Sequence, residues 1–206
     1  MRTIKSWWLI LAFLSGFGLA MFAEELVLTW REDRLLFSTP HVHFLSGRPL
    51  ELLHNAAPVP FDFKLTISSG TKSHIFREVA DRFVISYDLW QEDFRVVKLQ
   101  SPRRAADHLT AQAAETWCWQ QVSEQASDGL HALGAAEPFW ARVEIRAEDG
   151  RDGPLFGRSL TDAGISLTSL IELFSRPPQA QQSRWGPYEA GPFTIDELRR
   201  APKRGS

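Results

Sequence analysis

The stretch from Phe61 to Leu99 decides the fold, because it contains three consecutive segments with the alternation of a β-strand. They read FDFKLTI (61–67), RFVISYD (82–88) and FRVVKL (94–99). In the first segment the large apolar side chains recur at every second residue, which places them on one face and the polar side chains on the other. The pattern predicts an antiparallel meander with one buried face.

Further strands are expected on both sides of this meander. Residues 26–38 read as a hairpin, and PFWARVEIRA (138–147) reads as the last clear strand. Both are candidates to extend the sheet. Residues 73–80 are ambiguous, since they could also lead directly into a long second strand of the meander.

Helices are expected at three places. A short one, capped by Ser46 or Gly47, ends at Asn55. A second begins at Ser101-Pro102, where a serine N-cap precedes a proline at N1, and runs to about Gln121. Its expected apolar stripe consists of Ala105, Leu109, Ala113 and Trp117. The third covers residues 166–174.

Together these elements predict an α+β domain. We expect a mostly antiparallel twisted sheet of five or six strands, with two or three helices packed on one face. A β-sandwich with inserted helices is the alternative, because the pattern contains five or six strands and only two or three helices.

The N-terminus has the layout of a secretory signal peptide, predicted over residues 1–23. Arg2 and Lys5 precede a 16-residue apolar run, and small residues follow at Ala20 and Ala23. The run is shorter than the roughly 20 residues that span a bilayer, although an uncleaved N-terminal membrane anchor remains the alternative. We therefore expect an exported protein of the periplasm or cell envelope.

The remaining chain divides into one domain and a tail. Residues 24–176 are expected to form the single α+β domain, and residues 177–206 a disordered tail rich in Pro, Gly and Gln. One helical turn is expected within the tail, at residues 195–200. The loop at 149–157 is rich in glycine and is expected to be mobile.

Composition excludes several classes of function. A formal net charge of −2 gives no electrostatic footprint for nucleic acid. The single cysteine, Cys118, cannot form an internal disulfide. It lies between two tryptophans without a basic neighbour, so we expect a packed helix cysteine instead of a nucleophile.

The meander also carries a resemblance to a known family. The segments AAPVPFDF (56–63), RFVISYD (82–88) and FRV (94–96) resemble the bacterial family of exported proteins called domain of unknown function 4390. The match covers roughly residues 26–175 and rests on strand patterns. The last segment of many members is Trp-rich and strand-like, whereas residues 166–174 here have helical spacing. The resemblance implies an envelope location and no assigned activity, and it offers no catalytic residues.

No motif for chemistry is present in the sequence. It contains no Gly-x-Ser-x-Gly, no phosphate loop and no dinucleotide fingerprint, so we predict no catalytic residue, no cofactor and no metal ligand. His41 and His43 have a spacing that metal sites can use, and with distant carboxylates they offer the weaker alternative of an enzyme or metal site. The interpretation that we favour is two surface histidines.

The aromatic residues carry more weight. Aromatic residues make up 12% of the chain, and eight are tryptophans. Packing in the core and at the sheet edge is the interpretation that we favour, and the alternative is that Trp30, Trp90 or Trp140 forms an exposed surface for a protein, a glycan or lipid headgroups. We expect Trp90, in the turn between Asp88 and Asp93, to fold back as a lid on the sheet edge.

These observations favour a non-enzymatic protein-interaction module that binds another envelope protein and no nucleic acid. A small apolar-ligand or lipid-binding module is the alternative. Membrane tethering is expected only if the leader is not cleaved.

Overall fold

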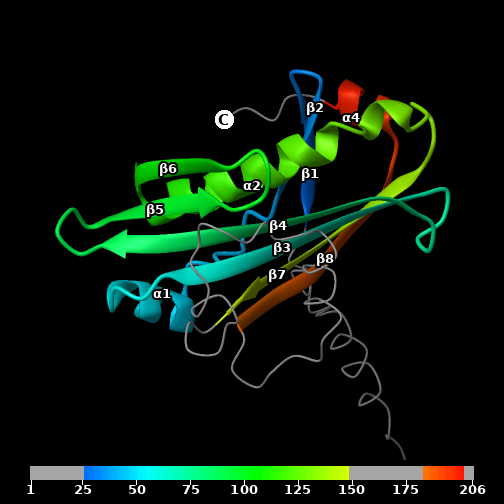
Figure 1. Cartoon of the computed structure of the whole chain (residues 1–206). Coiled ribbons are helices and arrows are strands. Elements are labelled where there is room, and N and C mark those ends of the chain that lie inside the picture. The colour runs from blue at the N-terminus through cyan, green and yellow to red at the C-terminus, as the bar shows by residue number, and fades with distance from the viewer. Residues whose placement is uncertain (1–25, 149–182, 202–206) are drawn as a thin grey trace, which may run out of the picture.

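The computed structural model describes residues 26–148 and 183–201, and its centre is a six-stranded antiparallel sheet (Figure 1). The strand order is β6-β5-β4-β3-β7-β8. The six strands are β3 (Val59–Ser69), β4 (Ile75–Asp88), β5 (Asp93–Lys98), β6 (Arg104–Leu109), β7 (Phe139–Ala147) and β8 (Ser183–Phe193). The other elements are β1 (Val27–Arg31), β2 (Arg34–Ser38), α1 (Gly47–His54), α2 (Ala111–Ser127), the 3₁₀ turn η1 (Leu130–Ala132) and α4 (Ile195–Arg200).

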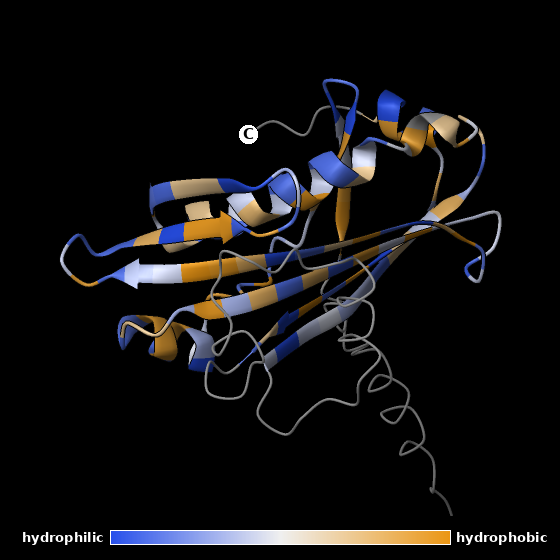
Figure 2. Ribbon diagram, viewed as in Figure 1, coloured by the Kyte–Doolittle hydropathy of each residue, from blue (hydrophilic) through white to orange (hydrophobic). Residues whose placement is uncertain are grey.

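The predicted meander is confirmed as β3, β4 and β5, and with it the α+β fold. Hydrophobic and hydrophilic residues alternate along these strands (Figure 2). The apolar side chains that alternate along β3 are all buried; they are Val59, Phe61, Phe63, Leu65 and Ile67. Of the ambiguous residues 73–80, residues 75–80 form the first half of β4. This strand pairs with β3 over nearly its whole length.

Helix α2 and the β1–β2 hairpin cover the apolar face of the sheet (Figure 1). The hairpin forms a two-stranded sheet of its own, so the prediction that it extends the main sheet is wrong. Two backbone N–H groups at the edge of the hairpin instead donate hydrogen bonds to side chains of α2. Ser123 Oγ accepts the backbone N–H of Phe37 at 3.0 Å, and Ser127 Oγ accepts that of Leu35 at 3.1 Å.

Aromatic contacts dominate the core between these layers. Phe44 packs against Phe61 and Phe63 with ring centroids 5.2 and 5.3 Å apart. Trp119 of α2 meets Phe63 edge-on at 5.5 Å. Such tilted and edge-to-face pairs are the favoured aromatic geometries, so Trp119 serves core packing.

The predicted start of the second helix, at Ser101-Pro102, is wrong. Residues 104–109 form β6, which pairs with β5, and α2 begins only at Ala111. Thr110 is its N-cap, because its hydroxyl accepts the backbone N–H of Ala113 at 3.2 Å. Ala105 and Leu109 therefore lie on a strand and not on the expected stripe. Pairing with β5 outweighs the helix propensity of the alanine-rich sequence.

The predicted disorder of the tail is wrong for residues 183–201. Strand β8 pairs with β7 and buries Tyr188, and a capping box between Thr194 and Glu197 starts α4. The helical turn expected at 195–200 is confirmed. Pro187 and Pro192 cannot donate to a ladder, which suits a strand at the sheet edge. The domain therefore includes residues beyond 176.

Several predictions lie outside the described residues: the leader, the loop at 149–157 and the helix at 166–174. Within the described parts, no helix is both long and apolar enough to span a membrane.

Candidate functional site

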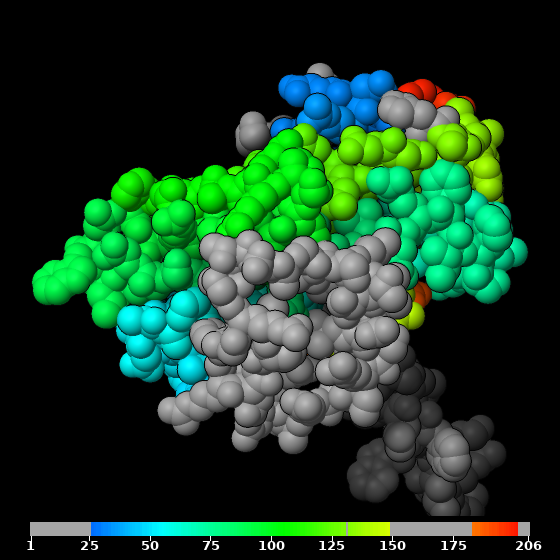
Figure 3. All heavy atoms as spheres, in the orientation of Figure 1, coloured from blue at the N-terminus to red at the C-terminus, as the bar shows by residue number. Residues whose placement is uncertain are grey.

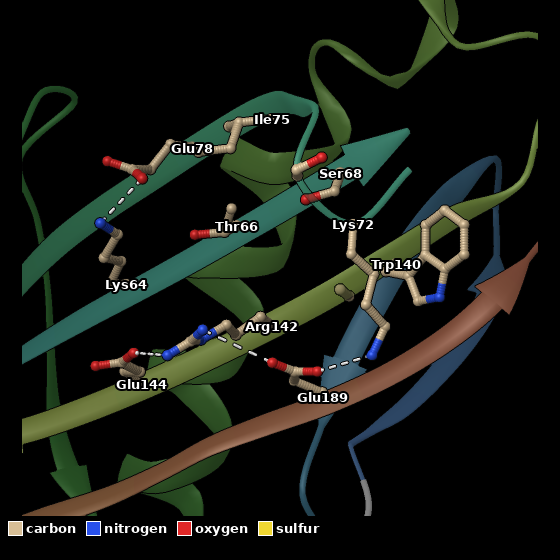
Figure 4. Close-up of a pocket in the computed structure, with 12 residues that line it drawn as sticks. Lys64, Thr66, Ser68, Lys72, Ile75, Glu78, Trp140, Arg142, Glu144 and Glu189 are labelled. Carbon is tan, nitrogen blue, oxygen red and sulfur yellow. Dashed lines mark hydrogen bonds and ion pairs between the residues drawn. The ribbon is translucent and has the colours of Figure 1, made fainter. Parts of the chain in front are cut away.

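The sheet face opposite α2 is polar and contains a groove of about 450 Å³ (Figure 4). Strands β3, β4, β7 and β8 each contribute side chains, because the residues out of phase with the core point to this face. The charged side chains that line it are Lys64, Lys72, Glu78, Arg142, Glu144 and Glu189.

Each of these six charged side chains belongs to at least one ion pair. Lys64 Nζ lies 3.0 Å from Glu78 Oε2, and Lys72 Nζ lies 3.1 Å from Glu189 Oε2. The remaining cation, Arg142, contacts both Glu144 at 2.7 Å and Glu189 at 3.7 Å.

Glu144 shows how this face stabilises its carboxylates. Burial alone would raise the pKa of Glu144, but the hydrogen bond from Arg142 and the positive charges of Arg184, Arg142 and Arg146 outweigh burial and lower it. The arginines around Glu144 therefore favour its ionised form.

Trp140 lines one end of the groove and is half-buried. Its ring packs against Gly191, where an added Cβ would lie 3.0 Å from Trp140 Cδ1 and 2.8 Å from the carbonyl oxygen of Phe139. Gly191 also has a φ of +123°, which favours glycine. The lack of a side chain at Gly191 on the edge strand therefore leaves room for the indole.

Trp90 lies at the tip of the β4–β5 hairpin, which projects at the left of the view in Figure 3. Its side chain is 96% exposed and that of Leu89 is 53% exposed, so the predicted lid over the sheet edge is wrong. The turn explains the outward position. Asp88 Oδ1 accepts the backbone N–H groups of Trp90 and Gln91, at 2.8 and 3.1 Å. We call residues 88–93 the hairpin tip.

An acidic hollow of about 410 Å³ lies beside the hairpin tip. In its wall, His108 Nδ1 lies 2.6 Å from Asp93 Oδ2, and Arg95 Nε lies 3.1 Å from Asp107 Oδ1. With Asp88 included, three carboxylates face one guanidinium and one histidine there.

Trp30 is engaged within the protein. The guanidinium carbon of Arg199 lies 4.8 Å from its ring centroid, a distance that allows a cation–π contact between α4 and β1. A hollow of about 270 Å³ adjoins it, lined also by Leu130, Leu133 and Ile195. Trp30, Trp90 and Trp140 therefore lie at three separate places, and none of these three hollows is lined by two of them.

The histidines do not assemble a larger site. His43 Nδ1 lies 3.0 Å from Glu115 Oε2, while His41 is exposed. Glu115 Oε1 also accepts the backbone N–H of Leu45 at 2.8 Å, so this pair connects α2 to the segment before α1. Among residues 26–148 and 183–201, no group of three or more His, Cys, Asp or Glu could hold a metal ion. Cys118 is buried on α2, as predicted, and burial raises the pKa of its thiol.

The sequence pattern missed a buried cluster of charges on the polar face. Arg82 Nη2 donates to Asp62 Oδ2 at 2.6 Å and to Glu148 Oε1 at 2.9 Å, and all three side chains are buried. Burial raises the pKa of Asp62 to about 6, although Arg82 opposes the shift.

A second buried pair lies on the apolar face. Lys98 Nζ lies 3.4 Å from Asp81 Oδ1 and donates to Gln125 Oε1 of α2 at 3.1 Å. Burial raises the pKa of Asp81 to about 6 against the effect of Lys98. One signal was available in the sequence, since Asp81 is in phase with Phe83 and Ile85 and therefore shares their buried face.

In the described part of the chain, the hairpin tip and the groove are both open to a ligand or partner. Their interpretation rests on their own chemistry, since comparisons with protein-family models, curated proteins and solved structures found no match to this chain.

Proposed function

We propose that this protein is an exported, non-enzymatic interaction module of the bacterial envelope, and that it docks a partner protein through the hairpin tip. The observation that carries the proposal is the 96% exposure of Trp90 beside a half-exposed Leu89. Side chains of this kind, when exposed together, are typical of interaction sites. The predicted signal peptide and the family resemblance support the location.

The geometry of the tip favours tight docking. Tryptophan is among the residues most often found to dominate binding energy at protein interfaces. The two backbone hydrogen bonds to Asp88 hold the turn in one conformation. A turn that is ordered before binding loses less conformational entropy when it docks, which strengthens association.

The charge around the tip indicates the chemistry of the partner. Asp88, Glu92 and Asp93 belong to the tip itself, while Asp107 in the adjoining hollow is paired with Arg95. An apolar pocket surrounded by Lys and Arg would complement this surface. An anionic lipid surface would be repelled by the same charges, which favours a protein over a membrane as the binding partner.

The alternative function is binding of an apolar ligand, and the hollow beside Trp30 is the best candidate site for it. Its lining includes Leu130, Leu133 and Ile195, but Arg199 lies over the Trp30 ring. The hollow of about 270 Å³ also lies below the usual range for ligand sites, roughly 300–1,000 Å³. We therefore retain the protein-interaction module as the proposed function.

Site-specific photo-crosslinking in cells tests this proposal. A benzophenone amino acid replaces Trp90 in one variant and Ile75 in a matched control. Ile75 is also a large exposed apolar residue, at 57%, but it lies at the opposite end of β4. We expect one protein adduct from the envelope fraction at position 90 that is absent at position 75. No adduct at position 90, or the same adducts at both positions, would contradict the proposal.

A further inference from the structure

The groove on the polar face has the size and access of a small-ligand site. Its volume of about 450 Å³ lies within the usual range of roughly 300–1,000 Å³. Side chains from four strands and from the β3–β4 connection converge on it (Figure 4). Because most of these side chains stand on paired strands, the groove is a preformed feature of the sheet.

The described lining is electrically balanced. Two lysines and one arginine face three glutamates, and all six are already ion-paired. A charged ligand would have to compete with one of these pairs. An apolar ligand would remove water from charged groups and offer no hydrogen bond in return, which is unfavourable.

The paired groups still offer many hydrogen bonds. Each carboxylate has about four acceptor sites and each guanidinium has five donors, more than one ion pair uses. Thr66 and Ser68 add hydroxyl groups to the lining. A ligand with many uncharged hydroxyls can both donate and accept here without disturbing the charge balance.

Trp140 supplies an aromatic surface at the end of the same groove. Gly191 leaves room for the ring beside β8, and the indole is half-buried, so part of it remains accessible to a ligand. An indole offers a broad apolar face with a polar N–H at its edge. This combination complements a sugar ring, which has C–H groups on its faces and hydroxyls at its rim.

We infer that the groove binds an uncharged oligosaccharide, with Trp140 as the stacking surface and the paired charges as hydrogen-bonding partners. This site is distinct from the hairpin tip, and the inference does not depend on the proposed protein partner.

The test is a titration of the purified ¹⁵N-labelled protein with four tetrasaccharides that differ in charge. Cellotetraose and N-acetylated chitotetraose are neutral, tetragalacturonate is anionic and deacetylated chitotetraose is cationic. The signal is the indole N–H resonance of Trp140, assigned by its absence from the spectrum of Trp140→Phe. We expect a saturable shift with at least one neutral sugar, and weaker binding of both charged sugars.

Variants then separate stacking from folding. Trp140→Ala should weaken binding of the neutral sugar about tenfold, as the loss of one aromatic contact implies. Trp140→Phe should retain most of the affinity because it keeps an aromatic face, and Trp90→Ala should bind as the parent does. Binding by the variants is followed by calorimetry, after circular dichroism has shown that each is folded.

The inference is wrong if neither neutral sugar gives a saturable shift, or if a charged sugar binds as tightly or more tightly. It is also wrong if Trp140→Phe and Trp140→Ala lose affinity to the same extent, because the aromatic face would then have no specific role.

Discussion

The guanidinium of Arg82 faces the carboxylate of Asp62 directly across the β3–β4 ladder, and both side chains are buried. Glu148, which follows β7, contacts the same guanidinium. A slip of one residue between β3 and β4 would separate Arg82 from Asp62 and place it opposite Phe61 or Phe63, since neighbouring residues point to opposite faces. The cluster therefore helps to specify the register of the central strands.

Loss of Arg82 should destabilise the fold strongly. Arg82→Met leaves two buried carboxylates without their cation, and we expect the free energy of unfolding to fall by about 3–5 kcal/mol in urea denaturation. The control is Arg95→Met, since the Arg95 side chain is 60% exposed and its ion pair with Asp107 lies at the surface. That change should alter stability by only about 0.5 kcal/mol. Equal losses in the two variants would contradict the assigned role.

Asp81 should titrate near pH 6. Its pKa is raised by burial from 3.8 to about 6 in the folded state, so the folded protein binds this proton more tightly than the unfolded chain does. The resulting stabilisation is fully present below about pH 4 and is lost as the pH rises through about 6. Carboxyl ¹³C NMR measures the midpoint directly, and a midpoint near 4 would contradict the structure.

The same shift makes a prediction for stability. Asp81→Asn cannot titrate, so the free energy of unfolding of the parent minus that of the variant should decrease between about pH 4 and 6 and stay constant above. Urea denaturation of both proteins across this range measures the difference. A difference that increases with pH would show that Lys98 dominates over burial.

Gly191 should resist substitution. Gly191→Ala introduces a Cβ 2.8 Å from the Phe139 carbonyl oxygen at a φ of +123°, so we expect a loss of about 1–3 kcal/mol and a shifted Trp140 indole resonance. Gly134→Ala is the matched control, because its Cβ would meet its nearest neighbour, Glu137, at an ordinary 3.5 Å. Thermal unfolding and NMR compare the two. An unchanged Trp140 resonance in Gly191→Ala would refute the supporting role of this glycine.

Asp88 should determine the order of the hairpin tip. Asp88→Ala removes the acceptor for the N–H groups of Trp90 and Gln91, so both amides should exchange faster with deuterium. Glu92→Ala removes the same charge from the same turn and should leave their exchange close to that of the parent. Similar acceleration in both variants would indicate an effect of charge and not of the hydrogen bonds.

The period-two pattern predicted the central strands because it reports which face each side chain occupies. It identified the apolar face of β3 and placed Asp62 on the other one. It does not report how deeply that second face is buried, so the Asp62–Arg82–Glu148 cluster could not be anticipated.

The errors have a common physical origin in pairing between segments distant in sequence. Residues 104–109 carry an alanine-rich helical signal, but β5 offers them a ladder, and the Pro/Gly-rich residues 183–193 find one on β7. Local propensity does not contain this information. Trp90 is a different case, because the Asp88 turn that directs its ring outward is local, whereas the size of the ring suggested a covered position.

The central claim is that Trp90 anchors a partner protein, and the affinity of the partner captured at position 90 tests it most directly. Calorimetry compares the parent, Trp90→Ala and Ile75→Ala. We predict that Trp90→Ala weakens binding by about 2 kcal/mol, or roughly 30-fold in Kd, and that Ile75→Ala has no effect. A Trp90→Ala variant that binds the partner as tightly as the parent would contradict the account.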